Sequence, residues 1–269
     1  MGKIISIINQ KGGVGKTTSA INIAASLAVA ERQTLLIDFD PQGNASSGLG
    51  IQTSDRGEKT IYQALVDECK IEDTLCETEL PGLYLIPADQ NLSGAEVELV
   101  GAFARETKLK KILEQIRDRF HYILIDCPPS LGLLTVNALT ASDSYFVPML
   151  CEYFSLEGLS QLVSTAGLIQ SALNPKLSLE GILLTMFDSR NNLAHQVADE
   201  VKKHFGDKLF NTIIPRNVKL SEAPSHGKPI LLYDIESKGA RAYLEVTKEI
   251  IERNMNRPKV QQNQPSALI

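Results

Sequence analysis

The chain has 269 residues, of which 43% are hydrophobic and 22% charged, and its formal net charge is −5. This length and apolar content predict one large domain with a sizeable core, and the acidic balance argues against a dedicated nucleic-acid-binding protein. No apolar run is long enough to span a bilayer, and the four cysteines form no C-x-x-C pair, so we expect reduced thiols in a cytosolic protein.

The first predicted elements flank a glycine-rich loop. Residues 3–8, "KIISII", have the β-branched composition of a strand, and residues 16–28 repeat apolar side chains at helical spacing. The segment "NQKGGVGKTT" at residues 9–18 therefore lies in the strand–loop–helix setting in which a phosphate-binding loop is meaningful. Backbone N–H groups of such a loop, together with the positive end of the helix dipole, suit phosphate oxygens.

Individual residues of this loop have predicted roles. Lys16 is placed to reach the β- and γ-phosphates of a nucleotide, and the Thr17 hydroxyl to ligate Mg²⁺. The loop departs from the standard pattern at Gln10, where a glycine is usual, and it carries an additional cation, Lys11. The predicted nucleotide-binding set of the loop is Lys11, Gly12, Gly13, Val14, Gly15, Lys16, Thr17 and Thr18.

Carboxylates close two further predicted strands. Residues 34–40, "TLLIDFD", end in Asp38 and Asp40, and residues 122–129, "YILIDCPP", contain Asp126. Ligands of parallel α/β sheets bind at the carboxyl ends of the strands, where these aspartates are expected to lie. An aspartate after an apolar strand suits the hydration shell of a nucleotide-bound Mg²⁺, and one before a responsive loop suits orientation of an attacking water.

The rest of the chain alternates strand and helix patterns. Further strands are predicted at residues 83–88, 144–150, 179–187 and 208–215. Helices are predicted at residues 108–119, 133–141, 156–173, 193–204 and 240–253. The alternation predicts a doubly wound α/β fold with a mostly parallel sheet flanked by helices. We expect residues 1–254 to form a single domain and the polar segment 255–269 to be disordered.

Five motifs together resemble one protein family. They are "KGGVGKTT", "LIDFDPQGNASSGLG", "YILIDCPPSLGLLTVNAL", "CEYFSLEGLSQL" and "IIPRNVKLSEAPSHGKPI". They closely resemble the ParA/Soj chromosome- and plasmid-partition ATPases, over about residues 3–252. The first motif is shared with the wider deviant-Walker-A group of P-loop ATPases, which includes MinD and the nitrogenase iron protein, whereas the later motifs are much more specific to the Soj branch. The chain resembles the short form, without a helix-turn-helix extension.

The resemblance implies a role for Lys11. In this family the corresponding lysine reaches across a homodimer in which two subunits enclose two ATP molecules, so dimerisation depends on ATP. A cation from the other chain would neutralise phosphate charge as an arginine finger does. The resemblance also implies slow, Mg²⁺-dependent ATP hydrolysis, in which Lys11, Lys16 and Asp40 are catalytic, Thr17, Asp38 and Asp126 surround the metal, and Pro215 and Asn217 form an adenine-binding turn.

The family also binds double-stranded DNA without sequence preference in its ATP-bound dimeric form. The corresponding basic residues are Arg190 and Lys219, the latter replacing an arginine that is usual in Soj-like sequences. Residues 186–259 carry 13 Lys and Arg against 10 Asp and Glu, a local basic excess in an acidic chain. The resemblance further implies a cytoplasmic, nucleoid-associated protein whose hydrolysis is stimulated by a ParB/Spo0J-like centromere-binding partner.

Three other functions compete with this interpretation. A MinD-like membrane-cycling ATPase needs a C-terminal amphipathic helix, and the Pro-interrupted segment after Arg253 argues against one and against stable membrane association. An iron–sulfur carrier needs cysteine ligands at the dimer axis, and neither Cys127 nor Cys151 lies in a cluster-binding loop. A nucleotide-switched scaffold with negligible hydrolysis remains open on sequence alone.

Overall fold

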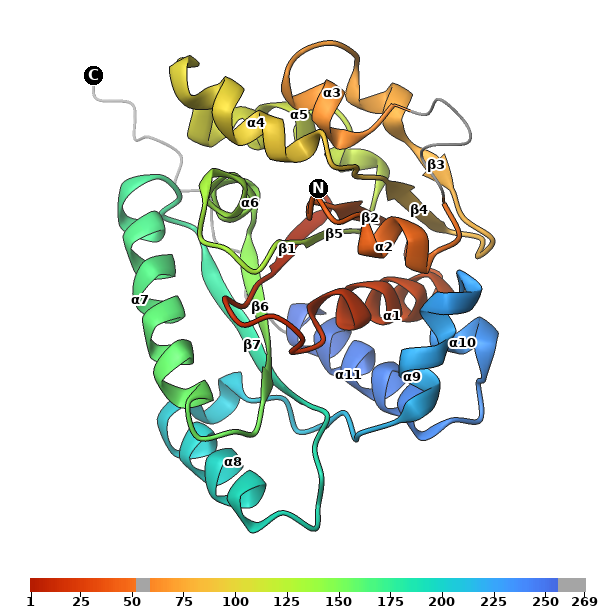
Figure 1. Ribbon diagram of the computed structural model, residues 1–269. Helices are drawn as coiled ribbons and strands as arrows, with labels where there is room; N and C mark the ends of the chain where they lie inside the picture. Colours follow the sequence, from red (N-terminus) through yellow and green to blue (C-terminus); the bar gives the residue numbers. More distant parts are fainter. Residues whose placement is uncertain (52–58, 256–269) are drawn as a thin grey trace, which may run out of the picture.

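A seven-stranded sheet forms the centre of the protein in the computed structural model, which describes residues 1–51 and 59–255 (Figure 1). The strand order is β3-β4-β2-β5-β1-β6-β7, and all neighbours are parallel except β3 and β4. The strands are β1 (Lys3–Ile7), β2 (Thr34–Asp38), β3 (Cys76–Glu77), β4 (Leu83–Ile86), β5 (Tyr122–Asp126), β6 (Ser144–Leu150) and β7 (Ser178–Thr185). The predicted doubly wound α/β fold is confirmed.

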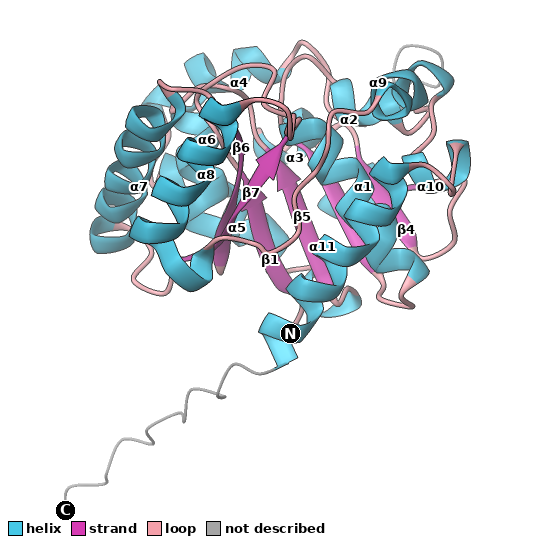
Figure 2. Cartoon of the chain, turned by 90° about the horizontal axis from the view of Figure 1, so that it is seen from below, coloured by secondary structure: helices cyan, strands magenta, loops and turns pink. Residues whose placement is uncertain are grey.

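Helices cover both faces of this sheet (Figures 1 and 2). One face packs against α1 (Lys16–Val29), α2 (Asn44–Gly48), α9 (Val218–Glu222), α10 (Ile230–Tyr233) and α11 (Lys238–Met255). The other packs against α3 (Ile61–Leu65), α4 (Leu92–Glu98), α5 (Lys108–Leu113), α6 (Leu133–Ala141), α7 (Ser155–Ala172) and α8 (Asn192–Phe205). None of the helices in these described ranges has the length and apolarity to cross a membrane.

The two buried faces explain the nearly continuous apolar runs of the sequence. Successive strand residues alternate between the layers, so Leu35 and Ile37 contact the α4–α7 side whereas Leu36 contacts the α1–α11 side. Each strand therefore needs apolar residues at consecutive positions, which is the pattern of a parallel sheet covered on both faces.

One predicted strand is wrong. Residues 208–215 form no strand and make only two isolated bridges to the β7 side, Ile182 with Leu209 and Phe187 with Pro215. Between these bridges, the backbone N–H groups of Asn211 and Thr212 donate to the Glu249 carboxylate of α11 at 3.0 and 2.8 Å. Because a side chain takes these donors, a continuous ladder does not form.

Other boundaries also differ from the sequence prediction. The helix predicted over residues 108–119 ends at Leu113, and a 3₁₀ turn follows at Arg117–Arg119. In between, the N–H of Ile116 donates to the carbonyl of Leu113, three residues back instead of four. The prediction did not include β3, α2, α3, α4, α9 or α10. Of the predicted disordered segment, residues 256–269 lie outside the described residues.

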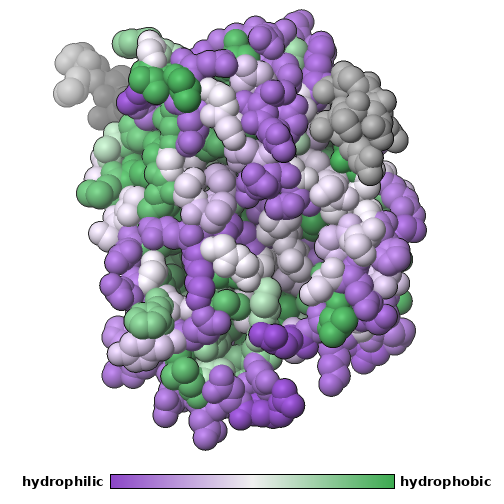
Figure 3. Space-filling model, in the orientation of Figure 1, coloured by the Kyte–Doolittle hydropathy of each residue, from purple (hydrophilic) through white to green (hydrophobic). Residues whose placement is uncertain are grey.

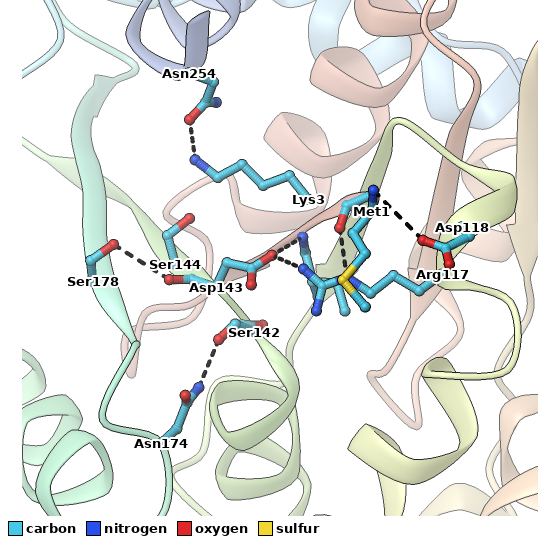
Figure 4. Close-up of polar contacts among 12 residues, drawn as sticks. Met1, Lys3, Arg117, Asp118, Ser142, Asp143, Ser144, Asn174, Ser178 and Asn254 are labelled. Atoms are coloured by element: carbon cyan, nitrogen blue, oxygen red, sulfur yellow. Dashed lines mark hydrogen bonds and ion pairs between the residues drawn. The ribbon is translucent and has the colours of Figure 1, made fainter. Parts of the chain in front are cut away.

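The amino ends of the central strands are held together by a polar cluster (Figure 4). The Asp143 carboxylate accepts hydrogen bonds from the backbone N–H of Ile4 at 2.8 Å and from the Arg117 guanidinium at 2.6 Å. Arg117 also donates to the carbonyl of Gly2 at 2.7 Å. This cluster fixes the start of β1 at the end of the sheet opposite to the glycine-rich loop.

Candidate nucleotide site

The glycine-rich loop between β1 and α1 is open toward solvent. Gly13 and Gly15 have φ values of 71° and 87°, in the left-handed region that favours glycine. A Cβ atom added at Gly12 or Gly13 would meet no atom within 4 Å. The backbone of the loop therefore borders empty space at the N-terminus of α1, as a phosphate-binding loop requires.

A cavity of about 470 Å³ lies against this loop. Among its lining residues are Gly12, Gly13, Gly15, Lys16, Thr17, Thr18, Asp40, Gln42, Asn44, Ser47, Pro129 and Pro224. Lys16 is largely buried there, and its ammonium donates to the carbonyl of Lys11 at 3.2 Å, so it lies across the loop. Burial lowers the pKa of Lys16, and the nearby Asp126 and Asp40 oppose this shift. The cavity thus combines one desolvated cation with free backbone donors.

Asp38 and Asp126 lie side by side on neighbouring strands. They are partners in the parallel register of β2 and β5, and both are completely buried. The Asp38 carboxylate accepts hydrogen bonds from the backbone N–H and the hydroxyl of Ser46 at 2.8 and 2.7 Å, and from the backbone N–H of Asp40 at 3.3 Å. Burial raises the pKa of Asp38 to about 6 despite these bonds.

Asp126 differs from Asp38 in its hydrogen bonding. Neither of its carboxylate oxygens has a hydrogen-bond partner within 3.5 Å in the described parts of the chain. Burial is the largest cause that raises its pKa well above the ordinary value, the charge of Asp38 adds to it, and the Thr17 side chain opposes it. A buried carboxylate without a partner is costly, so this arrangement favours a site completed by a cation.

These residues fit a nucleotide-bound Mg²⁺. Thr17 and Asp126 supply the oxygen donors that Mg²⁺ prefers, beside a loop that suits phosphates. Within residues 1–51 and 59–255, no group of three His, Cys, Asp or Glu residues is placed to hold a metal ion by itself. Mg²⁺ commonly takes most of its ligands from phosphates and water, so this finding agrees with a nucleotide-dependent metal site. The lone pairs of Asp38 are engaged by Ser46 and Asp40, which suits an orienting role.

Asp40 lies on the wall of the cavity, at the turn after β2. Its carboxylate accepts from the backbone N–H of Gln42 at 3.0 Å, and its carbonyl accepts from Gly43 at 2.9 Å. Gly43 has a φ of 64° and leads directly into α2. The turn therefore presents a carboxylate to the cavity while its own backbone is held by that carboxylate.

Lys11 points away from the cavity that the rest of the loop lines. Its ammonium forms an ion pair with Glu152, at 2.5 Å between Nζ and Oε2, and both side chains are about half exposed. Glu152 follows β6, and the next two residues, Tyr153 and Phe154, are exposed aromatic side chains in edge-to-face contact. The lysine thus lies at the rim of the site, on an exposed and partly aromatic surface.

Pro215 and Asn217 lie outside the phosphate cavity. Pro215 bridges to Phe187 just beyond β7, and the side chain of Asn217 accepts from the backbone N–H of Lys219 at the start of α9. Neither residue lines the 470 Å³ cavity. Their predicted contact with an adenine stays a prediction.

Arg190 and Lys219 are both exposed, as a DNA contact requires, and both have an acidic neighbour. The guanidinium of Arg190 makes two hydrogen bonds to the Asp188 carboxylate, at 2.9 and 2.8 Å. The ammonium of Lys219 lies 3.0 Å from Glu222 and 5.5 Å from the ring centre of Tyr233. Any phosphate contact by these cations competes with the carboxylates beside them.

Sequence reasoning missed Thr185 and Met186 at the end of β7. The buried Thr185 hydroxyl lies 2.8 Å from the carbonyl oxygen of Val14 and 3.1 Å from that of Met149, so it connects the loop to β6 and β7. Met186 has a φ of 50°, rare for a side-chain-bearing residue, and its side chain lies beside Gly15. A lone threonine at the end of the apolar run "LEGILLTMF" was the available signal.

Comparison with known proteins identifies relatives that match over most of the chain. A family profile described as an AAA domain matches residues 2–179. The chain is 57% identical over 250 residues to the sporulation initiation inhibitor protein Soj of Bacillus subtilis, covering 93% of this chain and 98% of that protein. It is 58% identical over 254 residues to the chromosome partitioning protein ParA of Myxococcus xanthus, covering 94% and 89%.

Solved structures share the fold. Cobyrinic acid a,c-diamide synthase from Mycobacterium smegmatis, with bound ADP and magnesium, aligns with a TM-score of 0.83 and 33% identity over 95% of this chain and 96% of that one. The cell-division ATPase MinD of Pyrococcus furiosus aligns with a TM-score of 0.77 and 27% identity over 94% and 100%. Both alignments extend well beyond the phosphate loop.

Proposed function

The chain belongs to the ParA/Soj family of chromosome-partitioning ATPases, and on that basis we propose that it is a DNA-partition ATPase that dimerises around ATP. The ATP-bound dimer binds DNA without sequence preference, and hydrolysis, stimulated by a ParB/Spo0J-like partner, returns it to monomers. The observation that carries the proposal is the placement of Lys11. It belongs to the phosphate loop, yet its ammonium lies outside the cavity of its own chain and pairs with exposed Glu152.

Within one subunit, the loop and Lys16 hold the phosphates. The loop N–H groups and the α1 dipole bind phosphate oxygens, and Lys16 exchanges its bond to the Lys11 carbonyl for a phosphate oxygen. Thr17 and Asp126 would hold Mg²⁺, which, when bound, neutralises negative charge on the transferring phosphoryl group. A phosphate and a cation together remove the two desolvation costs of the site, at Lys16 and at Asp126.

Asp40 is the residue that orients water. Its carboxylate lines the cavity and accepts a hydrogen bond from the attacking water, so the oxygen lone pair faces the terminal phosphorus. The water oxygen bonds to the terminal phosphorus as the bond from that phosphorus to the ADP oxygen breaks. The proton of the water passes to a phosphate oxygen, and ADP and phosphate leave. The same carboxylate of Asp40 also accepts a hydrogen bond from the N–H of Gln42. A shift of this carboxylate on release of phosphate would therefore rearrange the turn that contains Gln42.

Lys11 of each subunit would reach the phosphates bound by the other. An exposed lysine–carboxylate pair contributes at most about 1 kcal/mol, so exchange of Glu152 for ATP phosphates costs little. Nucleotide thereby controls dimerisation, and dimerisation doubles the number of cations offered to DNA.

The test compares the Lys11→Ala, Asp40→Ala double variant with its Asp40→Ala parent. In both proteins the expected slow hydrolysis preserves the ATP-bound state. We expect ATP binding within about threefold of the parent and loss of the ATP-dependent dimer, because Lys16 holds phosphates within one chain. The measurement is light scattering after size exclusion with ATP. Lys59→Ala is the matched control, since Lys59 is an equally exposed lysine paired with Asp73 away from the site. Dimers that persist without Lys11 would contradict the proposal.

A second measurement separates the partition ATPase from a scaffold that barely hydrolyses ATP. ATP turnover is followed with DNA, with the ParB/Spo0J-like protein, and with both. The proposal expects the largest rate with both present and a loss of about a hundredfold or more in Asp40→Ala. A basal rate that neither addition changes would favour the scaffold.

A further inference from the structure

An exposed apolar group lies on α4 and the turn after it. Val97, Val100 and Phe103 recur at three-residue spacing, and their exposed fractions are 75%, 61% and 96%. Val97 is the penultimate residue of α4, and Val100 lies in the 3₁₀ turn Leu99–Gly101. We call these three residues the α4 patch. In Figure 3, hydrophobic side chains gather at the upper left, where α4 lies in Figure 1. Clustered exposed apolar side chains mark interaction sites more often than single ones do.

Two carboxylates neighbour the α4 patch in the sequence. Glu96 and Glu98 flank Val97, and the exposed Glu98 accepts a hydrogen bond from the Tyr62 hydroxyl at 3.0 Å. The cation nearest in sequence, Arg105, is already engaged by Glu106 and by the carbonyl of Val100. The patch therefore combines apolar contact with net negative charge, which complements a basic amphipathic segment.

Glu96 connects this surface to the nucleotide site. Its carboxylate accepts from the backbone N–H of Leu134 in the first turn of α6, at 3.4 Å. It also packs so closely on Gly132 that a Cβ there would lie 2.3 Å from Oε1. The segment before α6 follows Asp126, the last residue of β5, and includes Pro129, which lines the 470 Å³ cavity. A ligand that displaces α4 would thus move the residues next to the buried aspartate.

From these contacts we infer that the α4 patch is the docking surface for a basic, amphipathic segment of the activating partner. The inference rests on the proposed function for the identity of that partner as the ParB/Spo0J-like protein. Leucine-like side chains of the segment cover Val100 and Phe103, and its cations lie against Glu96 and Glu98. Docking draws Glu96 from the start of α6 and shifts the Pro129 loop, which changes the surroundings of Asp126 and Asp40.

The first experiment measures binding at the patch itself. The probe is a fluorescent synthetic peptide of about five helical turns built only from Leu and Lys, with the leucines on one face. The full chain is compared with a Val100→Ser, Phe103→Ser double variant, which we expect to bind at least about tenfold more weakly. Leu168→Ser is the matched control, because Leu168 is an equally exposed apolar residue on α7, outside the patch. Equal affinities for wild type and the double variant would overturn the inference.

The second experiment measures activation by the ParB/Spo0J-like protein. We expect the double variant to keep its basal ATPase rate and melting temperature and to lose at least about tenfold of the stimulation, whereas Leu168→Ser keeps it. Glu96→Gln should bind the peptide within about threefold of wild type yet respond weakly to the partner, since its altered bond to Leu134 uncouples docking from the site. Stimulation that is unchanged in the double variant would refute the assignment of this partner to the patch.

If something other than the partner's segment occupies the α4 patch, the same measurements give different results. If a chain ending at Met255 binds the peptide about tenfold more tightly than the full chain, residues 256–269 occupy the patch and the inference is wrong. If the double variant alters the oligomeric state without altering peptide affinity, a second copy of the chain is the occupant. If the partner fails to stimulate wild type while the peptide still binds at the patch, the proposed partner is wrong and the docking surface stands.

Discussion

Asp126 and Asp38 occupy equivalent strand positions and are both buried, but they differ in their hydrogen bonding. Asp38 is held by Ser46 and Asp40, whereas Asp126 has no comparable partner among residues 1–51 and 59–255. Their proximity raises the pKa of Asp126 further. We therefore expect Asp126 to destabilise the protein without ligands. It lies beside Lys16 and Thr17, which line the cavity that suits phosphates.

Asp126→Asn should raise the stability of the ligand-free protein and abolish its further stabilisation by Mg²⁺–ATP. Removing a buried acid group that lacks a partner is expected to stabilise the ligand-free protein by about 1–3 kcal/mol, which corresponds to a rise of several degrees in Tm. The additional stabilisation by ATP with Mg²⁺ should disappear. Differential scanning fluorimetry with and without Mg²⁺–ATP measures both effects, and Asp118→Asn, at an exposed position, serves as control. A lower Tm in the ligand-free variant would show that Asp126 has a structural partner.

Cys151 provides a test by pH. Burial raises the pKa of its thiol to about 11. Only the thiolate reacts with iodoacetamide, so the modification rate at Cys151 should increase about tenfold per pH unit from pH 8 to pH 10. In urea-unfolded protein the rate should level off near pH 9, because an ordinary cysteine has a pKa of about 8.5. Peptide mass spectrometry follows the modification; a plateau near pH 9 in the folded protein would mean an accessible, ordinary thiol.

At the scale of elements, the end of β7 connects two functional regions. Thr185 bonds to the phosphate loop, Met186 packs beside Gly15, and the same segment continues to Asp188 and Arg190. A movement of the phosphate loop on nucleotide binding could therefore reach Arg190, a predicted DNA contact, through the short segment 185–190. The strained backbone of Met186, between the two, is a position at which such a change would be absorbed.

Thr185→Val should weaken nucleotide binding without unfolding the protein. Valine keeps the shape but leaves the buried carbonyl of Val14 without the donor it has now, a loss of about 1–3 kcal/mol in local stability. We expect ATP affinity to fall about tenfold and the ATP dependence of DNA binding to decrease with it. Thr185→Ser retains the hydroxyl and is the control. If the valine variant binds a fluorescent ATP analogue as tightly as wild type does, Thr185 does not position the loop.

At the scale of the whole molecule, the proposed DNA binding would depend on a balance of charges. The chain is acidic overall, and the two candidate DNA contacts are each paired with a carboxylate of their own subunit. At these two positions a single subunit thus offers DNA no uncompensated cation. In the proposed dimer, alignment of two subunits by ATP would double the contacts, and counterion release would then make the affinity depend steeply on salt.

Asp188→Asn should strengthen DNA binding. It removes the carboxylate that holds Arg190, and the freed guanidinium contacts a phosphate in each subunit. Affinity of the ATP-trapped dimer for unrelated duplexes should increase, and the slope of log affinity against log salt should become steeper by up to about 2. Arg190→Ala should flatten the slope by a similar amount. Asp73→Asn, whose partner Lys59 is remote from Arg190 in sequence, is the control for net charge. An unchanged slope in both Arg190 and Asp188 variants would exclude this loop from the DNA interface.

The sequence predicted those features that depend on neighbours along the chain. The strand, loop and helix around Lys16 are contiguous, so the pattern alone identified them, and alternating elements predicted the parallel sheet. Residues 208–215 were mispredicted because Glu249, far along the chain, takes two of their N–H groups. The engagement of Asp38 by Ser46 and the rim position of Lys11 beside Glu152 also depend on folded geometry, which no local pattern contains.

The contact between the first and last long helices has a consequence for synthesis on the ribosome. The buried Ser19 hydroxyl of α1 lies 3.1 Å from the hydroxyl of Tyr243 in α11, and these two helices belong to the same core layer. At about 5–20 residues per second, more than about ten seconds separate translation of the two. During that interval α1 lacks its permanent cover. We therefore expect α1, with the phosphate loop at its start, to reach its final packing only when the chain is nearly finished.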